Sequence, residues 1–200
     1  MVIKRYISLH LLALLLMSSP IAAQSSSIQT EVQTLLETRD QQIKQLLGAE
    51  GFKYSDQQRS QLKEIVNGII DFDAMAKTAL ESTYDTISVD TRDEFIRLFS
   101  SIIRDQSLAN LDIYRAVITY EIISGSFDST YVQTNAEWDN IRTPVHYKMK
   151  KESGEWKITD MSIDDVFTAE SYNRQFQRII ASRGFNYLMD TLRKRAERNS

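Results

Sequence analysis

The sequence predicts an α+β fold, in which helices pack on a curved antiparallel sheet of four strands or slightly more. Apolar residues recur at helical spacing from residue 28 to about residue 114, and again from residue 171 onwards. Between residues 117 and 163 they alternate with polar residues instead, as in half-buried strands. Short turns join the alternating stretches, so neighbouring strands run antiparallel. No repeat or linker interrupts the chain, and 200 residues suit one domain.

The first 23 residues predict a cleaved export signal. Two cations near the start precede an almost wholly apolar run at 9–17, and small residues end at Ala23. The run is too short for a membrane span, which needs about 20 residues, although a permanent N-terminal anchor stays open as the alternative. No cysteine follows the cleavage point, which excludes a lipid-anchored lipoprotein. We expect a mature domain of residues 24–200 with a net charge of −5, because cleavage removes two cations and no acid.

Three helical stretches precede the predicted strands. They cover residues 28–47, 55–80 and 90–114. Ser55 or Asp56 can cap the second stretch, and Gly68 predicts a bend within it. Four alternating stretches then predict strands at 117–124, 131–138, 143–150 and 155–163. Helical spacing returns from residue 171 to Gly184 and continues beyond it through Leu192, so we expect the helices to pack on one face of the sheet.

The chain holds few residue types that carry out catalysis. It has no cysteine, which excludes disulfides, thiolate metal sites and cysteine nucleophiles. His146 is the one histidine of the mature chain, which excludes histidine dyads and multi-histidine metal sites. We expect this side chain to face solvent, on the opposite side of its strand from Val145, Tyr147 and Met149. No glycine-rich phosphate loop is present, and the acidic net charge disfavours nucleic acid. We expect neither a metal nor a cofactor.

Large apolar side chains, in contrast, are plentiful on helix faces and at alternate strand positions. They are Phe72, Met75, Phe95, Phe99, Tyr147, Met149, Trp156, Met161, Phe167, Tyr172 and Phe176. They form either an ordinary filled core or the lining of a cavity, because a sheet that curves away from its helices can leave space between the layers. Spacing alone does not separate the two. The cations at 193–198 complement a helix C-terminus or, alternatively, dock an acidic partner or an anionic lipid surface.

Several motifs occur in a recognisable order. An apolar-x-Tyr strand at 145–147 precedes Gly-x-Trp-x-Ile-x-Asp at 154–160, and Tyr172 is followed by Gln175 and Phe176. Gly184 precedes a helix with Leu188 and Leu192, and upstream segments match at Asp71, Phe72, Leu80, Phe95 and Phe99. This ordered set resembles the MlaC family, also called the toluene-tolerance or ABC-transporter auxiliary component family. The likeness extends over most of the mature chain.

The chain departs from the family pattern at four places. Glu81 stands where the family usually has Gly, and Tyr84 stands where it usually has Trp. Residues 165–167 read Asp-Val-Phe in place of Gly-Val-Ser. Asn173 replaces the usual Arg, and Arg174 follows one place later.

The resemblance implies an exported, periplasmic phospholipid carrier without catalytic residues, and a fold with an apolar cavity between sheet and helices. The implied lining of that cavity is Phe72, Met75, Phe95, Phe99, Tyr147, Met149, Trp156, Met161, Val166, Tyr172 and Phe176. It also places Arg174 near the opening, and Arg142, at the turn before the third strand, is a second candidate for the head group. Arginine suits phosphate because its donors match the phosphate oxygens in pairs.

The resemblance further implies the partners of such a carrier. They are phospholipid, an inner-membrane ABC-transporter complex and an outer-membrane lipoprotein complex, between which a monomer would help to maintain outer-membrane lipid asymmetry. Two other functions stay open. One is an enzyme for a small apolar substrate with Asp160 or His146 as base, and the other is an interaction module with a filled core and no ligand.

Overall fold

The computed structural model describes residues 20–51, 54–109 and 111–199 of the 200-residue chain. The predicted export signal at 1–23 lies outside these residues except for 20–23, and it stays a prediction.

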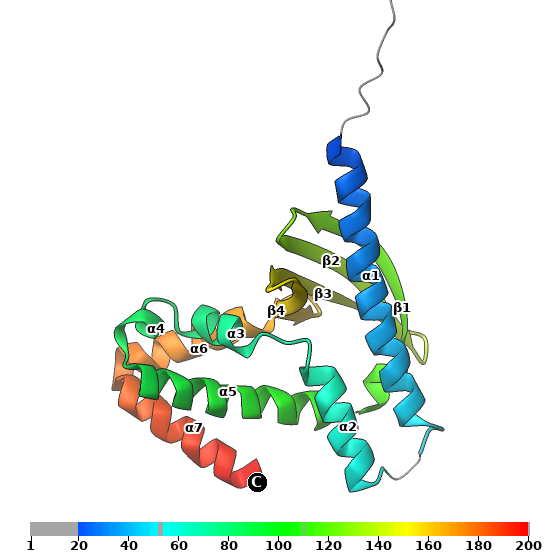
Figure 1. The fold of residues 1–200 in the computed structure, drawn as a ribbon. Helices are drawn as coiled ribbons and strands as arrows, with labels where there is room; N and C mark the ends of the chain where they lie inside the picture. Colours follow the sequence, from blue (N-terminus) through cyan, green and yellow to red (C-terminus); the bar gives the residue numbers. More distant parts are fainter. Residues whose placement is uncertain (1–19, 52–53, 110, 200) are drawn as a thin grey trace, which may run out of the picture.

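A five-stranded antiparallel sheet, in the order β1-β2-β3-β4-β5, confirms the predicted α+β class (Figure 1). Its strands are β1 (Val117–Gly125), β2 (Ser129–Trp138), β3 (Ile141–Glu152), β4 (Glu155–Ile163) and β5 (Val166–Phe167). The four predicted strands are therefore confirmed, and β2 and β3 are longer than expected. The pairing is bulged at two places, near Glu121 in β1 and near Thr159 in β4. Bulges increase the local twist and bend the strands that hold them.

One long helix, α1 (Pro20–Leu47), lies over the inner face of the sheet (Figure 1). Val32 and Leu36 point from α1 into the layer between helix and sheet and are buried. Gln29 Nε2 donates a hydrogen bond to the carbonyl of Ile123 at 2.8 Å. Lys151 on β3 also pairs with Glu31, with Nζ and Oε1 2.7 Å apart. Two polar contacts thus hold α1 to the sheet, one at β1 and one at β3.

The predicted helix at 55–80 is broken in two. Its first part, α2 (Asp56–Asn67), begins with a capping box of Ser55 and Gln58. Beyond Gly68 the chain runs beside β4, where the amide of Ile158 donates to the carbonyl of Ile69 and its carbonyl accepts from the amide of Asp71. At the expected bend, the backbone therefore leaves the helix and forms two hydrogen bonds with the sheet. Asp71 then caps α3 (Phe72–Leu80) by accepting from the amide of Ala74 at 2.9 Å.

Glu81 joins α3 to α4 (Ser82–Thr86) in a conformation that suits glycine. Its φ is +49°, in the left-handed region that residues with a Cβ rarely adopt. Glycine, the residue that the resemblance implies at this place, adopts this backbone without strain. Tyr84, the other nearby departure, donates a 2.5 Å hydrogen bond from its hydroxyl to Asp73 Oδ1.

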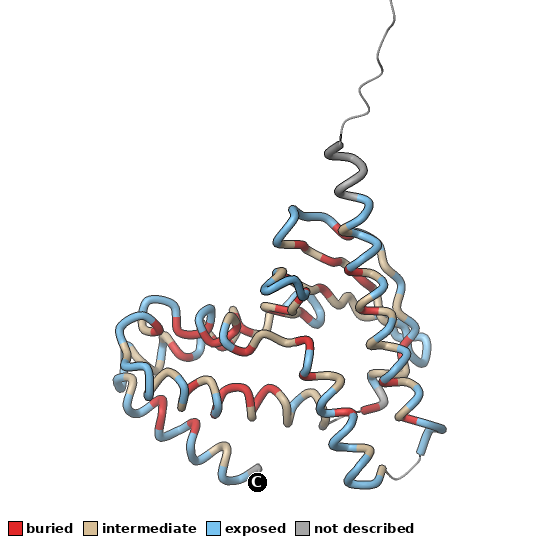
Figure 2. The backbone as a smooth tube through the Cα atoms, viewed as in Figure 1, coloured by how far each residue is buried: buried red, intermediate tan, exposed pale blue. Residues whose placement is uncertain are grey.

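The remaining helices are α5 (Val89–Ala109), η1 (Leu111–Arg115), α6 (Thr168–Arg183) and α7 (Phe185–Asn199). Helices α5, α6 and α7 form a lobe with its own core, to which α3 and α4 contribute, whereas η1 packs against α1. The core of the lobe is aromatic: the ring centroid of Phe99 lies 5.6 Å from Phe95, 5.1 Å from Tyr172 and 5.8 Å from Phe176. Within the described residues, α3 and α6 meet the sheet at β4, whereas α1 covers its face. Figures 1 and 2 show this lobe beside the sheet, with buried residues along the helix faces that meet.

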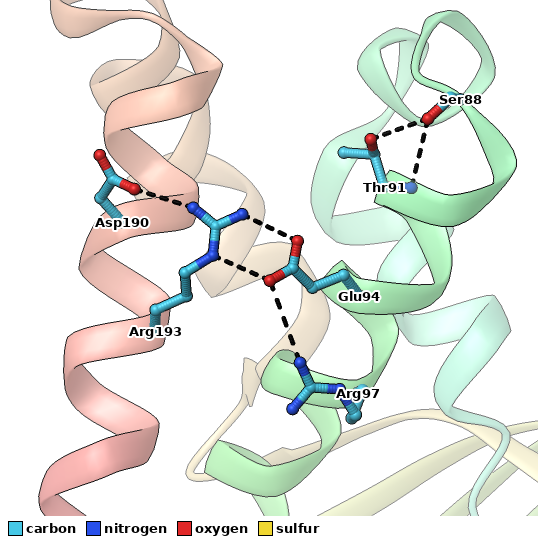
Figure 3. Close-up of polar contacts among 6 residues, drawn as sticks. All are labelled: Ser88, Thr91, Glu94, Arg97, Asp190 and Arg193. Carbon is cyan, nitrogen blue, oxygen red and sulfur yellow. Dashed lines mark hydrogen bonds and ion pairs between the residues drawn. The ribbon is translucent and has the colours of Figure 1, made fainter.

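An ion-pair network on the surface ties α5 to α7 (Figure 3). The guanidinium of Arg193 donates to both carboxylate oxygens of Glu94, each at 2.8 Å, and to Asp190 at 2.8 Å. The hydrogen bond from Arg193 lowers the pKa of Glu94. At the start of α5, the hydroxyl of Ser88 accepts from the amide of Thr91. The charges of this surface are therefore paired with one another.

Candidate functional site

The inner face of the sheet and α1 enclose an apolar layer, here called the inner-face cluster. Its buried members are Val32, Leu36, Ile69, Ile123, Val132, Met149, Trp156 and Ile158. Half-buried side chains at Ile28, Leu35, Ile70, Tyr120, Tyr147 and Met161 pack against it. The helical spacing of α1 and the alternation of the strands direct these side chains toward each other.

Two tyrosines, Tyr120 and Tyr147, pack against the inner-face cluster without adding charge to it. Burial raises the pKa of Tyr147 to about 12, with smaller contributions from Tyr114 and Asp40. Burial also raises the pKa of Tyr120. Both phenols are therefore neutral at physiological pH, and the layer is apolar up to their hydroxyls.

Two neighbouring hollows lie beside α1 and share Arg39, and the first of them opens onto the inner-face cluster. Together we call them the α1 groove. One part, with a volume of about 270 Å³, lies between α1 and the β3–β4 turn. A second part, of about 430 Å³, lies between α1 and α2. Residues of the first part are Glu31, Leu35, Arg39, Gly68, Ile69, Gly154, Glu155, Trp156 and Lys157. Those of the second are Arg39, Gln42, Gln45, Leu46, Gln61, Glu64 and Ile65.

Charged side chains surround the apolar floor of the first part of the groove. Lys151 donates to both oxygens of Glu31, and this hydrogen bond lowers the pKa of Glu31. The indole N–H of Trp156 itself has no acceptor within hydrogen-bond distance. Lys157 pairs with Glu155 at 3.1 Å. The floor itself is made of Leu35, Ile69 and Trp156, which are shared with the inner-face cluster.

The structure divides the residues that were predicted to line one cavity. Four of them, Tyr147, Met149, Trp156 and Met161, contribute to the inner-face cluster. The other buried ones pack in the core of the helical lobe: Phe72, Met75, Phe95, Phe99, Tyr172 and Phe176. Val166 is 52% exposed on β5, and Phe167 is half-buried beside Tyr131. The predicted residues of the helices and of β3 and β4 thus belong to two separate layers.

The two arginines predicted for a head group lie apart from both layers. Arg142 is exposed and donates from Nη2 to Glu121 Oε1 at 2.7 Å. Arg174 is exposed on α6. Neither lines the α1 groove. The cation that does line both parts of it is Arg39, which sequence reasoning missed. Its position four residues after Leu35, on the flank of the apolar stripe of α1, was a usable signal.

The expectation that His146 faces solvent is wrong. Its side chain does lie on the outer face, opposite Tyr147, but the residue is only 9% exposed. The β4–β5 turn brings Asp165 over it, with Oδ1 3.2 Å from His146 Nε2, and the ring of Tyr131 packs at 5.8 Å. Strand β5 is two residues long, so alternation is too short to predict it or the turn that brings Asp165 over this histidine.

Asp160 also lies on this outer face and joins the sheet to α6. Its Oδ1 accepts hydrogen bonds from the amides of Met161 and Ala169, each at 2.9 Å. Ala169 is in the first turn of α6, so Asp160 takes the part of a cap there. Burial raises the pKa of this carboxyl, and the two amides oppose that effect. Asp160 and His146 are thus on the side of the sheet away from the inner-face cluster.

No helix within 20–51, 54–109 and 111–199 combines the length and the apolar character of a membrane-crossing segment. In the same residues, no group of three or more acidic, histidine or cysteine side chains is arranged to hold a metal ion.

Known proteins with a similar sequence or fold bear on the function of this site. No curated protein matches the chain. Among solved structures, the phospholipid-binding protein from Ralstonia solanacearum, in complex with a phospholipid, is similar with a TM-score of 0.68 at 18% identity. That match covers 88% of this chain and 98% of the other, and at this identity it shows a shared fold. The family model described as MlaC protein matches residues 37–194, most of the chain. The chain therefore belongs to the MlaC protein family.

Proposed function

We propose that this protein binds a phospholipid and carries it through water, with the acyl chains against the inner-face cluster and the head group in the α1 groove. The observation that carries the proposal is an apolar sheet face closed by one helix, with a groove beside that helix leading to it. The family match and the lipid-bound Ralstonia neighbour support the same assignment.

The energetics of lipid in water explain why a carrier is needed. A diacyl phospholipid exposes about 30 methylene groups, each worth about 0.8 kcal/mol, so leaving a membrane unaided costs on the order of 20 kcal/mol. A carrier lowers this cost by covering the chains, and it returns them unchanged. Binding of this kind requires an apolar layer and a wet opening, and it requires no nucleophile, metal or acid–base pair.

Lipid entry requires α1 to move off the sheet. The first part of the groove, at about 270 Å³, is below the roughly 300–1,000 Å³ of sites that enclose small ligands. Val32 and Leu36 occupy the remaining space between helix and sheet. We propose that acyl chains replace these α1 side chains as the helix lifts. The Glu31–Lys151 pair and the Gln29 hydrogen bond hold the helix, and partly exposed pairs of this kind are worth at most about 1 kcal/mol.

The cellular setting is part of the proposal. An export signal at 1–23 would deliver the mature domain, residues 24–200, to the periplasm as a monomer. There it would shuttle phospholipid between an inner-membrane ABC-transporter complex and an outer-membrane lipoprotein complex, and so help to maintain outer-membrane lipid asymmetry. The resemblance to the MlaC family supports these steps.

The experiment that tests binding is organic extraction of the purified protein followed by lipid mass spectrometry. We expect about one phospholipid per protein, by analogy with a single enclosed ligand. Protein that purifies empty, and that takes up no lipid from vesicles, would contradict the proposal.

A cross-link tests the movement of α1. The chain has no cysteine, so Glu31→Cys with Lys151→Cys can be joined specifically by a short bis-maleimide. The joined protein is expected to lose uptake of lipid from vesicles, while each single variant, capped with a monovalent maleimide, keeps it. Equal uptake by joined and unjoined protein would show that α1 stays in place.

A further inference from the structure

We propose that Arg39 binds the phosphodiester of the lipid head group. The inference rests on the proposed function and names a residue that recognises the ligand at the α1 groove.

Arg39 is the groove cation whose charge is left available. Its side chain is half-buried, and its one described polar contact is to Gln42 Oε1 at 3.5 Å, the outer limit of a hydrogen bond. Within the described residues, no carboxylate lies within ion-pair distance of its guanidinium. The neighbouring lysines differ: Lys151 is paired with Glu31, and Lys157 with Glu155.

The position of Arg39 suits the junction between head group and chains. It lines both parts of the α1 groove, so its side chain lies between the two spaces. On one side the floor consists of Leu35, Ile69 and Trp156, which lead into the inner-face cluster. Trp156 is only 4% exposed, and its indole N–H has no acceptor there. A lipid whose phosphate contacts Arg39 can therefore direct its chains toward the cluster and leave its head group in water.

The chemistry of the groove selects an anion with paired oxygens. A guanidinium carries five N–H donors in a planar fork, which matches two phosphate oxygens at once. The carboxylates of Glu31 and Glu155 are already neutralised by their lysines, so they repel a phosphodiester weakly. Glu64 is the acidic residue that lines the second part of the groove, on the α2 side. A phosphodiester on the Trp156 side of Arg39 keeps away from it.

The experiment measures transfer of pyrene-labelled lipid from vesicles to the protein. Phosphatidylglycerol is compared with diacylglycerol that bears the same labelled chains and has no phosphate. For Arg39→Gln we expect the affinity for phosphatidylglycerol to fall about tenfold, at the lower end for hydrogen bonds to charged groups. Affinity for diacylglycerol is expected to stay within twofold. Arg39→Lys keeps the positive charge and loses the planar fork of donors. Its affinity for phosphatidylglycerol is expected to lie between those of the wild type and Arg39→Gln. Equal effects on the two lipids, or none, would overturn the assignment.

Two controls separate a role of Arg39 in binding the head group from a general effect of charge and from binding of a soluble phosphodiester. Arg59→Gln removes an exposed arginine of α2 that lies outside the groove, and it is expected to leave both lipids unaffected. Soluble glycerophosphoglycerol carries the phosphodiester without chains. We expect it not to displace the labelled lipid at equal concentration, and displacement there would identify a soluble phosphodiester as the ligand instead. A wild-type protein that takes up neither lipid would refute the proposed function, whereas uptake that is insensitive to Arg39 would refute only the role of this residue.

Discussion

Truncation of Phe99 separates a filled helical core from a lipid site. Phe99 has no exposed surface, and its ring packs against three other aromatic rings at centroid distances of 5.1 to 5.8 Å. Removing such a side chain leaves a cavity, so Phe99→Ala is expected to destabilise the protein by about 3–5 kcal/mol. At about 2–4 °C per kcal/mol for a domain of this size, the melting temperature falls by roughly 6–20 °C.

The assay pairs thermal unfolding, followed by circular dichroism, with the phospholipid content of the folded protein at low temperature. Phe99→Ala is expected to melt early and to keep its lipid. Met149→Ala is the matched variant: Met149 is 1% exposed in the inner-face cluster, and the variant is expected to lose lipid. If Phe99→Ala instead costs less than about 1 kcal/mol and empties the protein, the rings of the lobe line the lipid site and the division into two layers is refuted.

Three further variants test single features of the fold. Glu81→Gly removes a backbone strain of about 1–3 kcal/mol at a positive φ, and it adds about 0.5–1 kcal/mol of conformational entropy to the unfolded chain. We therefore expect the free energy of unfolding in urea to rise by about 1 kcal/mol. A fall in that free energy would contradict the strain. Asp160 has a raised pKa in the folded protein, so its contribution to stability falls as pH rises from its unfolded pKa of about 3.9 through its folded pKa. Asp160→Asn still offers an oxygen to the amide of Ala169 and has no charge to titrate. The free energy of unfolding of the wild type relative to this variant should therefore decline as pH rises over that window. A relative free energy that grows with pH would contradict the raised pKa. Ser55→Ala removes the capping box of α2 and is expected to lower the free energy of unfolding by about 1 kcal/mol. The control Ser60→Ala, at an exposed position of the same helix, should change it by less than about 0.5 kcal/mol. Equal effects of the two variants would exclude a capping role for Ser55.

Alternation and helical spacing were sufficient for the main elements of the fold because each spans several periods. The four long strands at 117–163 were predicted with ends within a few residues of those observed. Features shorter than one period were missed. Strand β5 and the bridge from Ile69 to Ile158 depend on contacts between distant segments, and the burial of His146 follows from β5.

The candidate site was harder to predict than the fold. Periodicity shows which face of its own element a residue occupies, and it does not show which element lies opposite. Phe99 and Met149 have equally apolar patterns, yet one faces α6 and the other faces α1. The spacing of Arg39 from Leu35 places it beside the apolar stripe of α1, but its place in the groove depends on α2 and the β3–β4 turn, which spacing does not locate.

The most direct measurement locates the acyl chains with the two tryptophans of the chain. Trp156 is buried in the inner-face cluster, whereas Trp138 lies at the opposite end of the sheet and is 37% exposed. Trp138→Phe leaves Trp156 as the only tryptophan, and Trp156→Phe leaves Trp138, so excitation selective for tryptophan reports each one alone. When each variant is loaded with phospholipid brominated along its acyl chains, we expect strong quenching of Trp156 and weaker quenching of Trp138. Bound lipid that leaves the emission of Trp156 unchanged would contradict the inner-face site.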